Sequence, residues 1–412
     1  IAGSKQGGRL MRPPDLLTAA GRRSRKGEYK TGMRVVIAID SLKGSLSSLE
    51  AGSTIAEGIK KVYPDAEIRI SPLADGGEGT AEALTLGLKG TWQSLSVTGP
   101  LGEPQPASYG ILPDGKTAVL EMASAAGITL VEPEKRNPMK TTTYGVGEMI
   151  RDAVEKGCRH FIVGIGGSAT NDGGIGMLQA LGFEMLDKEG NQVPFGGEGL
   201  SVLHKIKAEH VMEELKECTF RIACDVTNPL CGPIGASAVY GPQKGADAEM
   251  VTKLDGLLGR CAFLAKELNP EADWEAPGTG AAGGLGFAFL TFTNAVLESG
   301  IRIVMEETHL EELVQDADLV VTGEGCLDGQ TVQGKAPVGV AGLAKKYGKP
   351  VIAFSGIAKK DASACNEAGI DAFFPILRRV TTLEEAMKPE NARENLLETS
   401  EQVFRLVKTV WG

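Results

Sequence analysis

The sequence has no long hydrophobic run, few aromatic residues and little histidine. No stretch of the 412 residues approaches the ~18–20 consecutive apolar residues that a helix needs to cross a bilayer, so no transmembrane helix is expected. Aromatic residues make up only 5%, yet apolar residues reach 42% and charged residues 23%, which is typical of a folded chain. A disordered protein is therefore excluded, and the length suits one large or two ordinary domains.

The histidines and cysteines form no pattern that predicts a metal site or a nucleophile. The four histidines are scattered, and no zinc-ligand spacing joins them to cysteines. The seven cysteines are odd in number and contain no C-x-x-C pair, which predicts reduced thiols in a reducing, cytoplasmic compartment. The G-x-S-x-G motif of many serine hydrolases is also absent. Zinc chemistry and Ser-His-Asp catalysis are both disfavoured.

Positive charge is concentrated near the N-terminus. Residues 1–32 contain eight Lys and Arg and two acidic residues, which gives +6; because the whole chain carries −10, the remainder carries −16. We interpret residues 1–32 as a leader or tag without ordered structure and Met33 as the natural start, with an Arg-rich transit peptide as the alternative. A body at −16 disfavours binding to nucleic acid or to an anionic membrane.

Apolar runs near both ends of the chain alternate with helical patterns. Strands are expected at 34–40, 66–71, 317–322 and 350–354, and helices at about 48–62, 80–88 and 336–347, the first with Ser47 or Ser48 as N-cap. This β-α-β-α order is typical of a parallel, doubly wound sheet. Residues 91–122 instead alternate apolar and polar positions, which indicates an antiparallel or mixed sheet.

The predicted fold class is therefore α/β, with two domains. A Rossmann-like parallel-sheet domain is expected from both chain ends, residues 33–94 and 291–412, with a second, mixed α/β domain inserted at 95–290. Small-molecule sites tend to lie between such domains, so loops from both are expected to line an interdomain cleft.

Glycine is the one residue in clear excess, and it gathers in loops. Its 55 copies are about 13% of the chain, against a usual ~7%. Loop 166–174 follows an expected strand and opens an expected helix, where backbone N–H groups and the helix N-terminus favour an anion. Candidate binding residues in this loop are Gly166, Gly167, Ser168, Thr170, Asn171 and Gly173. Asp172, in the same loop, can hold a metal, deprotonate a hydroxyl or simply cap the helix.

Carboxylates and lysines recur in other loops. Asp75 follows the second expected strand, where a hard oxygen ligand suits Mg²⁺, and Lys43 follows the first. Asp225 and Lys244 lie on later loops and are an acid and a base of the type used in phosphoryl transfer. The structural alternatives are a capped turn for Asp75 and a solvated loop lysine for Lys43.

Two segments fit nucleotide-binding motifs only in part: one lacks a required residue and the other lacks the required strand before it. Residues 329–335 fit G-x-x-x-x-G-K but continue with Ala336 rather than Ser or Thr, which excludes a standard Walker A loop. Residues 278–283 fit G-x-G-x-x-G but follow no strand, so a nicotinamide oxidoreductase is disfavoured. Glu324 and Asp328, beside the first motif, remain candidates to hold Mg²⁺.

In this order, the glycine-rich segments resemble those of the type I glycerate kinase family. They are DSLKGSLSS, PLADGGEGT, GIGGSATNDGGIGMLQALG, CDVTNPLCGPIGA, YGPQKGA, GTGAAGGLG and TGEGCLDGQTVQGKAP, and the resemblance extends from Met33 to the C-terminus. It implies two α/β domains with the cleft between them. It also implies transfer of the γ-phosphoryl group of ATP, with Mg²⁺, to a hydroxyl of D-glycerate; 2-phosphoglycerate is the favoured product, and 3-phosphoglycerate stays open.

The resemblance indicates which loops form the site, and the needs of phosphoryl transfer lead to a hypothesis for the role of each residue. Lys43 and Lys244 are expected to contact the glycerate carboxylate or the transferring phosphoryl group, and Asp172 or Asp225 to accept the hydroxyl proton. The carboxylates expected to hold Mg²⁺ are Asp75, Glu324 and Asp328. The groups expected to hold phosphates are the 166–174 loop, Gly283 and Gly284.

Two alternatives remain at this stage. The first is a kinase of another small hydroxy acid, which loop composition cannot separate from a glycerate kinase. The second is a non-catalytic small-molecule-binding protein, which can also have two α/β domains and a cleft. Neither alternative involves nucleic acid or a membrane, and nothing in the sequence sets the oligomeric state.

Overall fold

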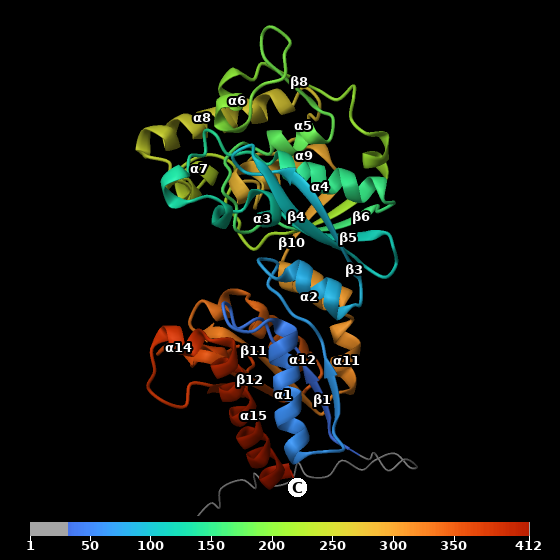
Figure 1. The fold of residues 1–412 in the computed structure, drawn as a ribbon, viewed down its shortest axis with the longest axis vertical. Coiled ribbons are helices and arrows are strands. Elements are labelled where there is room, and N and C mark those ends of the chain that lie inside the picture. Colours follow the sequence, from blue (N-terminus) through green and yellow to red (C-terminus); the bar gives the residue numbers. More distant parts are fainter. Residues whose placement is uncertain (1–31, 412) are drawn as a thin grey trace, which may run out of the picture.

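The computed structural model describes residues 32–411, which form two lobes stacked along the long axis of the molecule (Figure 1). The leader expected at residues 1–32 lies outside these residues except for Gly32. No helix of the described part is long and apolar enough to cross a membrane.

The lower lobe is built on a five-stranded, entirely parallel sheet that combines both ends of the chain. Its strands, in spatial order, are β13 (Ala372–Pro375), β12 (Val351–Ala358), β11 (Leu319–Leu327), β1 (Arg34–Ile37) and β2 (Glu67–Ile70). The two N-terminal strands thus form one edge of a sheet whose other strands come from the last quarter of the chain.

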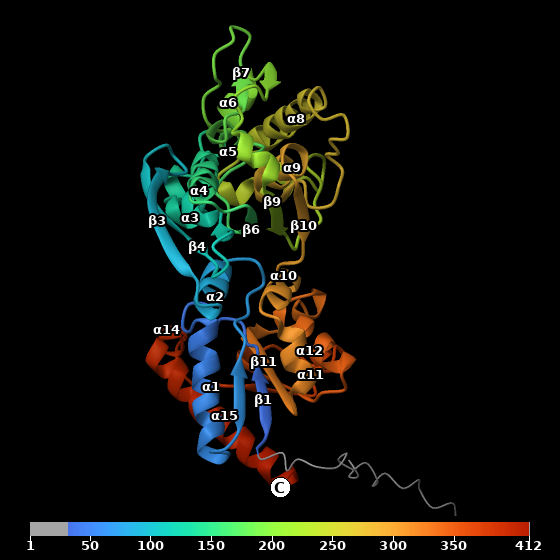
Figure 2. The same ribbon diagram turned by 90° about the vertical axis from the view of Figure 1, so that its right-hand side faces the viewer.

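Helices cover both faces of this sheet (Figure 2). On one face, α1 (Ser48–Val62) and α15 (Pro389–Trp411) pack on Val35 and Ile37; on the other, α11 (Leu310–Asp316) and α12 (Ala336–Lys346) pack on the face of Val36. Successive strand residues point to opposite faces, so the apolar run Val35–Ile37 in β1 is suited to a sheet covered on both sides. The remaining helices of this lobe are α10 (Gly300–Glu307), α13 (Ala364–Glu367) and α14 (Leu383–Met387).

The upper lobe contains a six-stranded mixed sheet. Its strands, in spatial order, are β10 (Ala295–Glu298), β9 (Thr219–Ala223), β6 (His160–Gly164), β5 (Thr117–Glu121), β4 (Pro104–Ile111) and β3 (Thr91–Thr98). The pairs β3–β4 and β4–β5 are antiparallel, as the alternation over 91–122 predicts, and the other pairs are parallel. A separate antiparallel pair joins β7 (Glu184–Leu186) to β8 (Lys205–Lys207).

Helices also surround the upper sheet. They are α3 (Ala123–Ala126), α4 (Tyr144–Glu155), α5 (Ile175–Ala180), α6 (Gly196–Val202), α7 (Ala236–Tyr240), α8 (Ala248–Ala265) and α9 (Leu285–Phe292). Short 3-10 turns occupy Ile128–Leu130, Pro133–Lys135, Glu213–Glu217, Pro242–Lys244, Ala281–Gly284 and Thr331–Gln333.

The waist between the lobes is filled by α2 (Thr80–Gly87) and by α10 (Figure 2). Leu84 of α2 and Ile301 of α10 belong to the same buried apolar cluster as Val119 and Ile162 of the upper sheet and Val36 of the lower sheet. One continuous hydrophobic cluster therefore runs from the lower sheet to the underside of the upper one.

The α/β class, the parallel sheet from both chain ends and the mixed sheet inserted between them are confirmed. The element limits differ in detail: β3 begins at Thr91 and β10 ends at Glu298, so the upper sheet reaches beyond the predicted 95–290 segment on both sides. The division into two domains at those residues stays a prediction.

Candidate functional site

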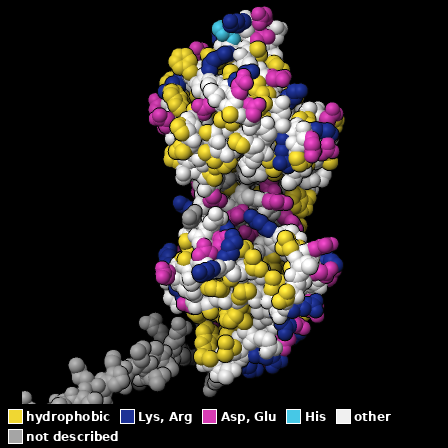
Figure 3. All heavy atoms as spheres, turned by 90° about the vertical axis from the view of Figure 1, so that its left-hand side faces the viewer, with side chains coloured by type: hydrophobic (Ala, Val, Ile, Leu, Met, Phe, Trp, Pro, Cys, Tyr) yellow, Lys and Arg dark blue, Asp and Glu magenta, His cyan; other side chains and the backbone are white. Residues whose placement is uncertain are grey.

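Two neighbouring cavities lie near the waist, one at the strand ends of the lower sheet and one beside the ends of β6 and β9 of the upper sheet, and they share Asp75. The upper cavity, of about 420 Å³, is lined by segment 75–77 of the lower lobe and by segments 165–168, 223–226, 243–244 and 281–282 of the upper lobe. The lower cavity, of about 400 Å³, is lined by segments 40–43, 324–326, 356–357 and 376–377 and by α14 and α15. Figure 3 shows acidic and basic side chains gathered at the waist, with hydrophobic side chains on the lower lobe beneath them.

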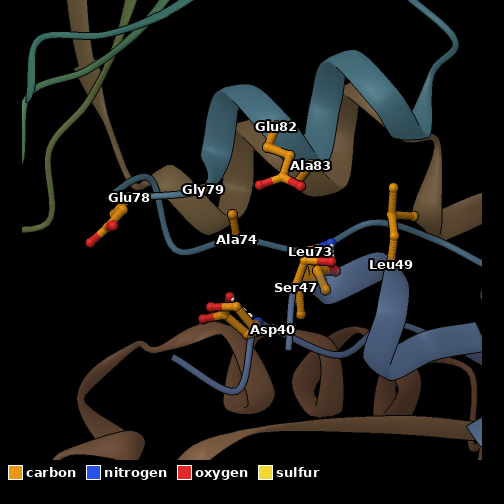
Figure 4. A pocket seen from close by; sticks show the side chains of 11 residues that line it. Asp40, Ser47, Leu49, Leu73, Ala74, Glu78, Gly79, Glu82 and Ala83 are labelled. Carbon is orange, nitrogen blue, oxygen red and sulfur yellow. Dashed lines mark hydrogen bonds between the residues drawn. The ribbon is translucent and has the colours of Figure 1, made fainter. Parts of the chain in front are cut away.

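The Asp40 carboxylate lies directly beyond β1, beneath the chain segment that carries Ala74 and Glu78 (Figure 4). A buried serine fixes this arrangement: the Ser48 hydroxyl donates to the carbonyl of Ile39 (2.7 Å) and accepts from the backbone N–H of Leu73 (2.9 Å). The start of α1 is thus tied to the ends of β1 and β2, which holds the two carboxylate-bearing loops side by side.

We call the charged lining of the lower cavity, with Asp40, Lys43, Asp75, Glu324 and Asp328, the lower wall of the site. Among its acidic residues, Asp40 has the most perturbed electrostatics. Burial, followed by the charge of Asp75, raises the pKa of Asp40 to about 7, and Glu324 adds a smaller contribution in the same direction. The backbone N–H of Ser41, at 2.6 Å, and the charge of Lys43 only partly offset this. A buried carboxylate whose charge is so weakly compensated is typical of a functional site. In a purely structural core, such a group is usually paired with a cation or absent.

Asp75 lies at the junction of the two cavities. Its carboxylate accepts from the Lys43 ammonium at 3.4 Å and from the backbone N–H of Gly77 at 3.1 Å. Gly76 has φ +88°, and a Cβ there would lie 2.6 Å from the Cα of Gly300, so only glycine allows the two segments to approach this closely. The backbone therefore presents Asp75 to both cavities at once.

The remaining acidic candidates lie at the end of β11 (Glu324) and directly after it (Asp328), and they are already paired. Glu324 accepts from the Thr331 hydroxyl (2.6 Å) and from Lys335 (3.5 Å). Asp328 accepts from Lys359 (2.8 Å), and this bond holds the pKa of Asp328 below its usual value. Burial raises the pKa of Glu324. Both residues line the lower cavity, and two lysines stand beside them.

The upper wall is formed by loop 166–168 and by a buried lysine. Lys244 is only 2% exposed, and its ammonium donates to the Ser168 hydroxyl (2.8 Å) and to the Thr170 carbonyl (2.6 Å). Burial lowers the pKa of Lys244 to about 7, with Asp172 acting in the opposite direction. Gly166, Gly167, Ser168 and Lys244 all line the upper cavity, where they can present hydrogen-bond donors to an anion.

The second predicted base candidate, Asp225, follows β9 and lines the upper cavity. Its carboxylate accepts from the backbone N–H of Gly300 (3.2 Å) and from the Ser299 side chain. Burial raises the pKa of Asp225, and the charge of Asp75 adds to this effect. The structure therefore brings Asp225 and Asp75 together from opposite lobes.

Asp172 lies elsewhere, fully buried behind the loop. Its two oxygens accept from the backbone N–H and hydroxyl of Thr143 (both 2.9 Å) and from the backbone N–H groups of Gly174 (3.0 Å) and Gly176 (3.4 Å). Burial raises the pKa of Asp172 in spite of these bonds. It is not among the residues that line the upper cavity, so its contacts tie the loop to α4 and α5.

Five further binding candidates do not line the upper cavity and lie behind its wall, as Asp172 does: Thr170, Asn171, Gly173, Gly283 and Gly284. The Asn171 amide donates to the Ser237 hydroxyl (2.8 Å), and the backbone N–H of Gly173 donates to the carbonyl of Gly283 (2.9 Å). A Cβ at Gly283, where φ is +67°, would lie 2.1 Å from the Thr170 carbonyl oxygen. These residues pack the 281–284 turn against the 166–174 loop.

The lower wall fits a divalent cation at Asp40 and Asp75 better than at the remaining candidates. The repulsion between Asp40 and Asp75 is offset only in part, by the backbone N–H of Ser41 and the charge of Lys43, whereas Asp328 is already paired with Lys359. Within residues 32–411, no group of three or more His, Cys, Asp or Glu side chains is arranged as a metal site. The donor set therefore suits a Mg²⁺ ion that arrives with further oxygen ligands, as it does on a nucleotide.

Sequence reasoning named Lys335 as a possible contact of a nucleotide or Mg²⁺, but it gave Asp40 no role and did not select Lys359 for the site. Asp40 carried a usable signal, because it ends an apolar strand expected to be parallel, and ligands bind at that edge of such sheets. Lys359 follows β12 at the same edge. Thirty-one residues separate it from Asp328, so no local pattern connects them.

Comparison with known proteins gives one consistent result. A sequence profile described as the glycerate kinase family matches residues 35–408. The chain is 47% identical over 371 residues to the "Glycerate 2-kinase" of Escherichia coli K12, and the match covers 90% of this chain and 97% of that protein. It is also 47% identical over 382 residues to the "Glycerate kinase" of Bacillus subtilis 168, covering 92% and 100%.

A solved structure agrees with these relatives. The crystal structure of a Salmonella typhimurium LT2 protein, assigned as a glycerate kinase 2, superposes with a TM-score of 0.86 at 46% identity and covers 92% of this chain and 100% of that one. The chain belongs to the glycerate kinase family of phosphotransferases.

Proposed function

We propose that this protein transfers the γ-phosphoryl group of ATP to D-glycerate, with 2-phosphoglycerate as the favoured product. The names of its relatives support glycerate as the acceptor. The observation that carries the proposal is the meeting of Asp225, Asp75, Lys244 and loop 166–168 around the upper cavity. Phosphoryl transfer needs groups that position the acceptor and neutralise charge, and these residues supply both.

In this proposal glycerate binds in the upper cavity, an interdomain cleft. Lys244, Ser168 and the backbone of Gly166 and Gly167 hold its carboxylate or the transferred phosphoryl group. Asp225 accepts the proton of the attacking hydroxyl, while the new O–P bond forms and the bond between the γ-phosphorus and the ADP oxygen breaks. The raised pKa of Asp225 suits this role, because a base works best with a pKa closer to the operating pH.

The lower wall takes the phosphates of the nucleotide. Mg²⁺, when bound, neutralises phosphate charge. Asp75 and Asp40 would hold it, and Glu324 would be a further oxygen donor. Asp328 is paired with Lys359 and would bind the ion only if that pair opened. Lys43 is 63% exposed at its side chain, so it can turn from Asp75 toward a phosphate without a large desolvation cost. The free state of all seven cysteines is in keeping with a cytoplasmic location.

The test is a coupled assay of ADP release with D-glycerate, ATP and Mg²⁺, followed by a phosphorus NMR spectrum of the product. The proposal expects turnover that depends on all three and a 2-phosphoglycerate signal. A 3-phosphoglycerate signal would correct the product alone. Turnover with another small hydroxy acid but not with glycerate would overturn the substrate, and absence of ADP release with every acid would overturn the kinase.

A further inference from the structure

The lining of the lower cavity is charged on one side and mostly apolar on the other. Over β2, β1 and β11 its wall is charged, with Asp75, Asp40, Lys43 and Glu324. Toward β12, β13 and α14 the wall is mostly apolar: it contains Ile357, Ile376, Leu377, Leu383 and Met387, although Lys359, which follows β12, also lines the cavity. A molecule that fills this cavity therefore has one charged part and one hydrophobic part.

Glycerate does not have this shape. It is a three-carbon acid with no apolar portion, so it would leave the apolar side of this cavity without a contact. A nucleoside triphosphate matches both parts, because a flat aromatic base continues into a polyanion. The charged side of the cavity also ends at Asp75, which it shares with the upper cavity, so a phosphate chain lying there points toward Asp225.

We propose that the apolar side of the lower cavity, formed by Ile357, Ile376, Leu377 and Met387, binds the base of the nucleotide. Asn395 of α15 lines the same cavity and offers an amide to the polar edge of the base. The inference rests on the proposed function in one respect: the position of Asp225 in the upper cavity assigns that cavity to glycerate. It adds which lobe holds the nucleoside and which helices, α14 and α15, cover it.

Two exposed hydrophobic residues provide a matched pair of variants. Ile357 is 45% exposed on the wall of the lower cavity, and Val226 is 37% exposed on the wall of the upper cavity. Because both are partly exposed β-branched residues, Ile357→Asn and Val226→Asn remove comparable apolar contacts with little effect on the core. Titration calorimetry of the full chain, without glycerate, would measure the affinity of each variant for ADP and for uncharged adenosine.

Ile357→Asn is expected to lower the affinity for ADP and for adenosine by about tenfold each. Val226→Asn is expected to change either affinity by less than about twofold. The reverse pattern would overturn the inference and place the base in the upper cavity. Equal losses in both variants would overturn it too. Wild-type ADP binding with the expected pattern but without glycerate phosphorylation would reject the proposed function alone. A wild-type chain that binds neither ADP nor adenosine would reject both.

A second measurement uses the unmodified protein. Cys326 lines the lower cavity and Cys224 the upper one, and both thiols are free and partly exposed. Adenosine is expected to slow the alkylation of Cys326, followed by peptide mass spectrometry, at least severalfold while leaving Cys224 unchanged. Protection of Cys224 instead of Cys326, or of neither at saturating adenosine, would contradict the inference.

Discussion

The two walls of the site hold their charges in different ways. On the lower wall, the side chains of Lys43, Lys359 and Lys335 are 63%, 58% and 36% exposed, and each reaches its carboxylate through solvent-accessible space. On the upper wall, Lys244 is almost completely buried and hydrogen-bonded, as is Asp172 behind that wall. Exposed pairs exchange partners at little cost, whereas buried ones are fixed when the chain folds. Changes to these buried groups of the upper lobe should therefore affect folding, and changes to the lower wall mainly nucleotide affinity.

The largest expected effect separates the two aspartates of the upper lobe. Asp225→Asn should lower kcat by about 10²–10⁴-fold, because an amide cannot accept the hydroxyl proton. The Tm should change little, since Asp225 accepts only from Gly300 and Ser299 at the edge of the cavity. The coupled assay and a thermal melt check the two statements.

Asp172→Asn is the matched control and should behave in the opposite way. Both Asp172 oxygens accept from N–H groups of Thr143, Gly174 and Gly176, and asparagine replaces one of these oxygens with an NH₂ donor that would face such a group. The free energy of unfolding should therefore fall by about 2–4 kcal/mol. A variant that stays stable but loses kcat as Asp225→Asn does would transfer the base role to Asp172.

The next effect tests whether the upper wall is as rigid as its contacts indicate. Gly283→Ala would place a Cβ 2.1 Å from the Thr170 carbonyl in a left-handed conformation, so the free energy of unfolding should fall by at least about 2 kcal/mol. Gly342→Ala, in the interior of α12, meets no atom within 4 Å and should stabilise by up to about 1 kcal/mol. Equal unfolding free energies in denaturant titrations would show that the 281–284 turn can adapt.

Sequence patterns located the elements better than the partners of the side chains. Helix 48–62 was predictable because its signal is local: Ser47 and Glu50 form a capping box at the start of α1. The Asp172 contacts were not, because Thr143 lies 29 residues away and a run of small polar residues does not show which side chain turns inward. Asp40 was missed for a related reason. Its raised pKa comes first from burial and then from the charges of Asp75 and Glu324, and all three depend on segments that only the folded chain brings near.

The pH dependence of Lys244 gives an effect of intermediate size. If its ammonium binds the substrate anion, kcat/KM for glycerate should fall by up to about tenfold per pH unit above pH 7, where the free enzyme loses the proton. Lys244→Met should lack this limb and have low activity at every pH. A profile that stays flat to pH 9 in the wild type would show that the neutral amine is sufficient.

The same lysine affects stability in a direction that can be derived. Its pKa is about 7 in the folded protein, against 10.5 for a lysine in water, so between these values the unfolded chain binds a proton that the folded chain does not. This group's contribution to the free energy of unfolding therefore rises with pH from about 7 to 10.5, since the cost of burying a lysine that is charged when unfolded is greatest at low pH. Melting curves of the wild type and of Lys244→Met should diverge in slope across this range.

The smallest expected effect is on the lower wall, where Lys335 stands 3.5 Å from Glu324. Exposed ion pairs contribute at most about 1 kcal/mol, so Lys335→Ala should shift the free energy of unfolding by less than that. Its KM for ATP should nevertheless rise severalfold, and the rise should shrink at high salt, because a phosphate attracts the ammonium through screened solvent. The KM for glycerate should stay unchanged, since Lys335 lines the cavity assigned to the nucleotide and not the upper one. An increase in the KM for glycerate instead would mean that the acid, and not the nucleotide, occupies the lower wall, and the division of labour between the two walls would have to be reversed.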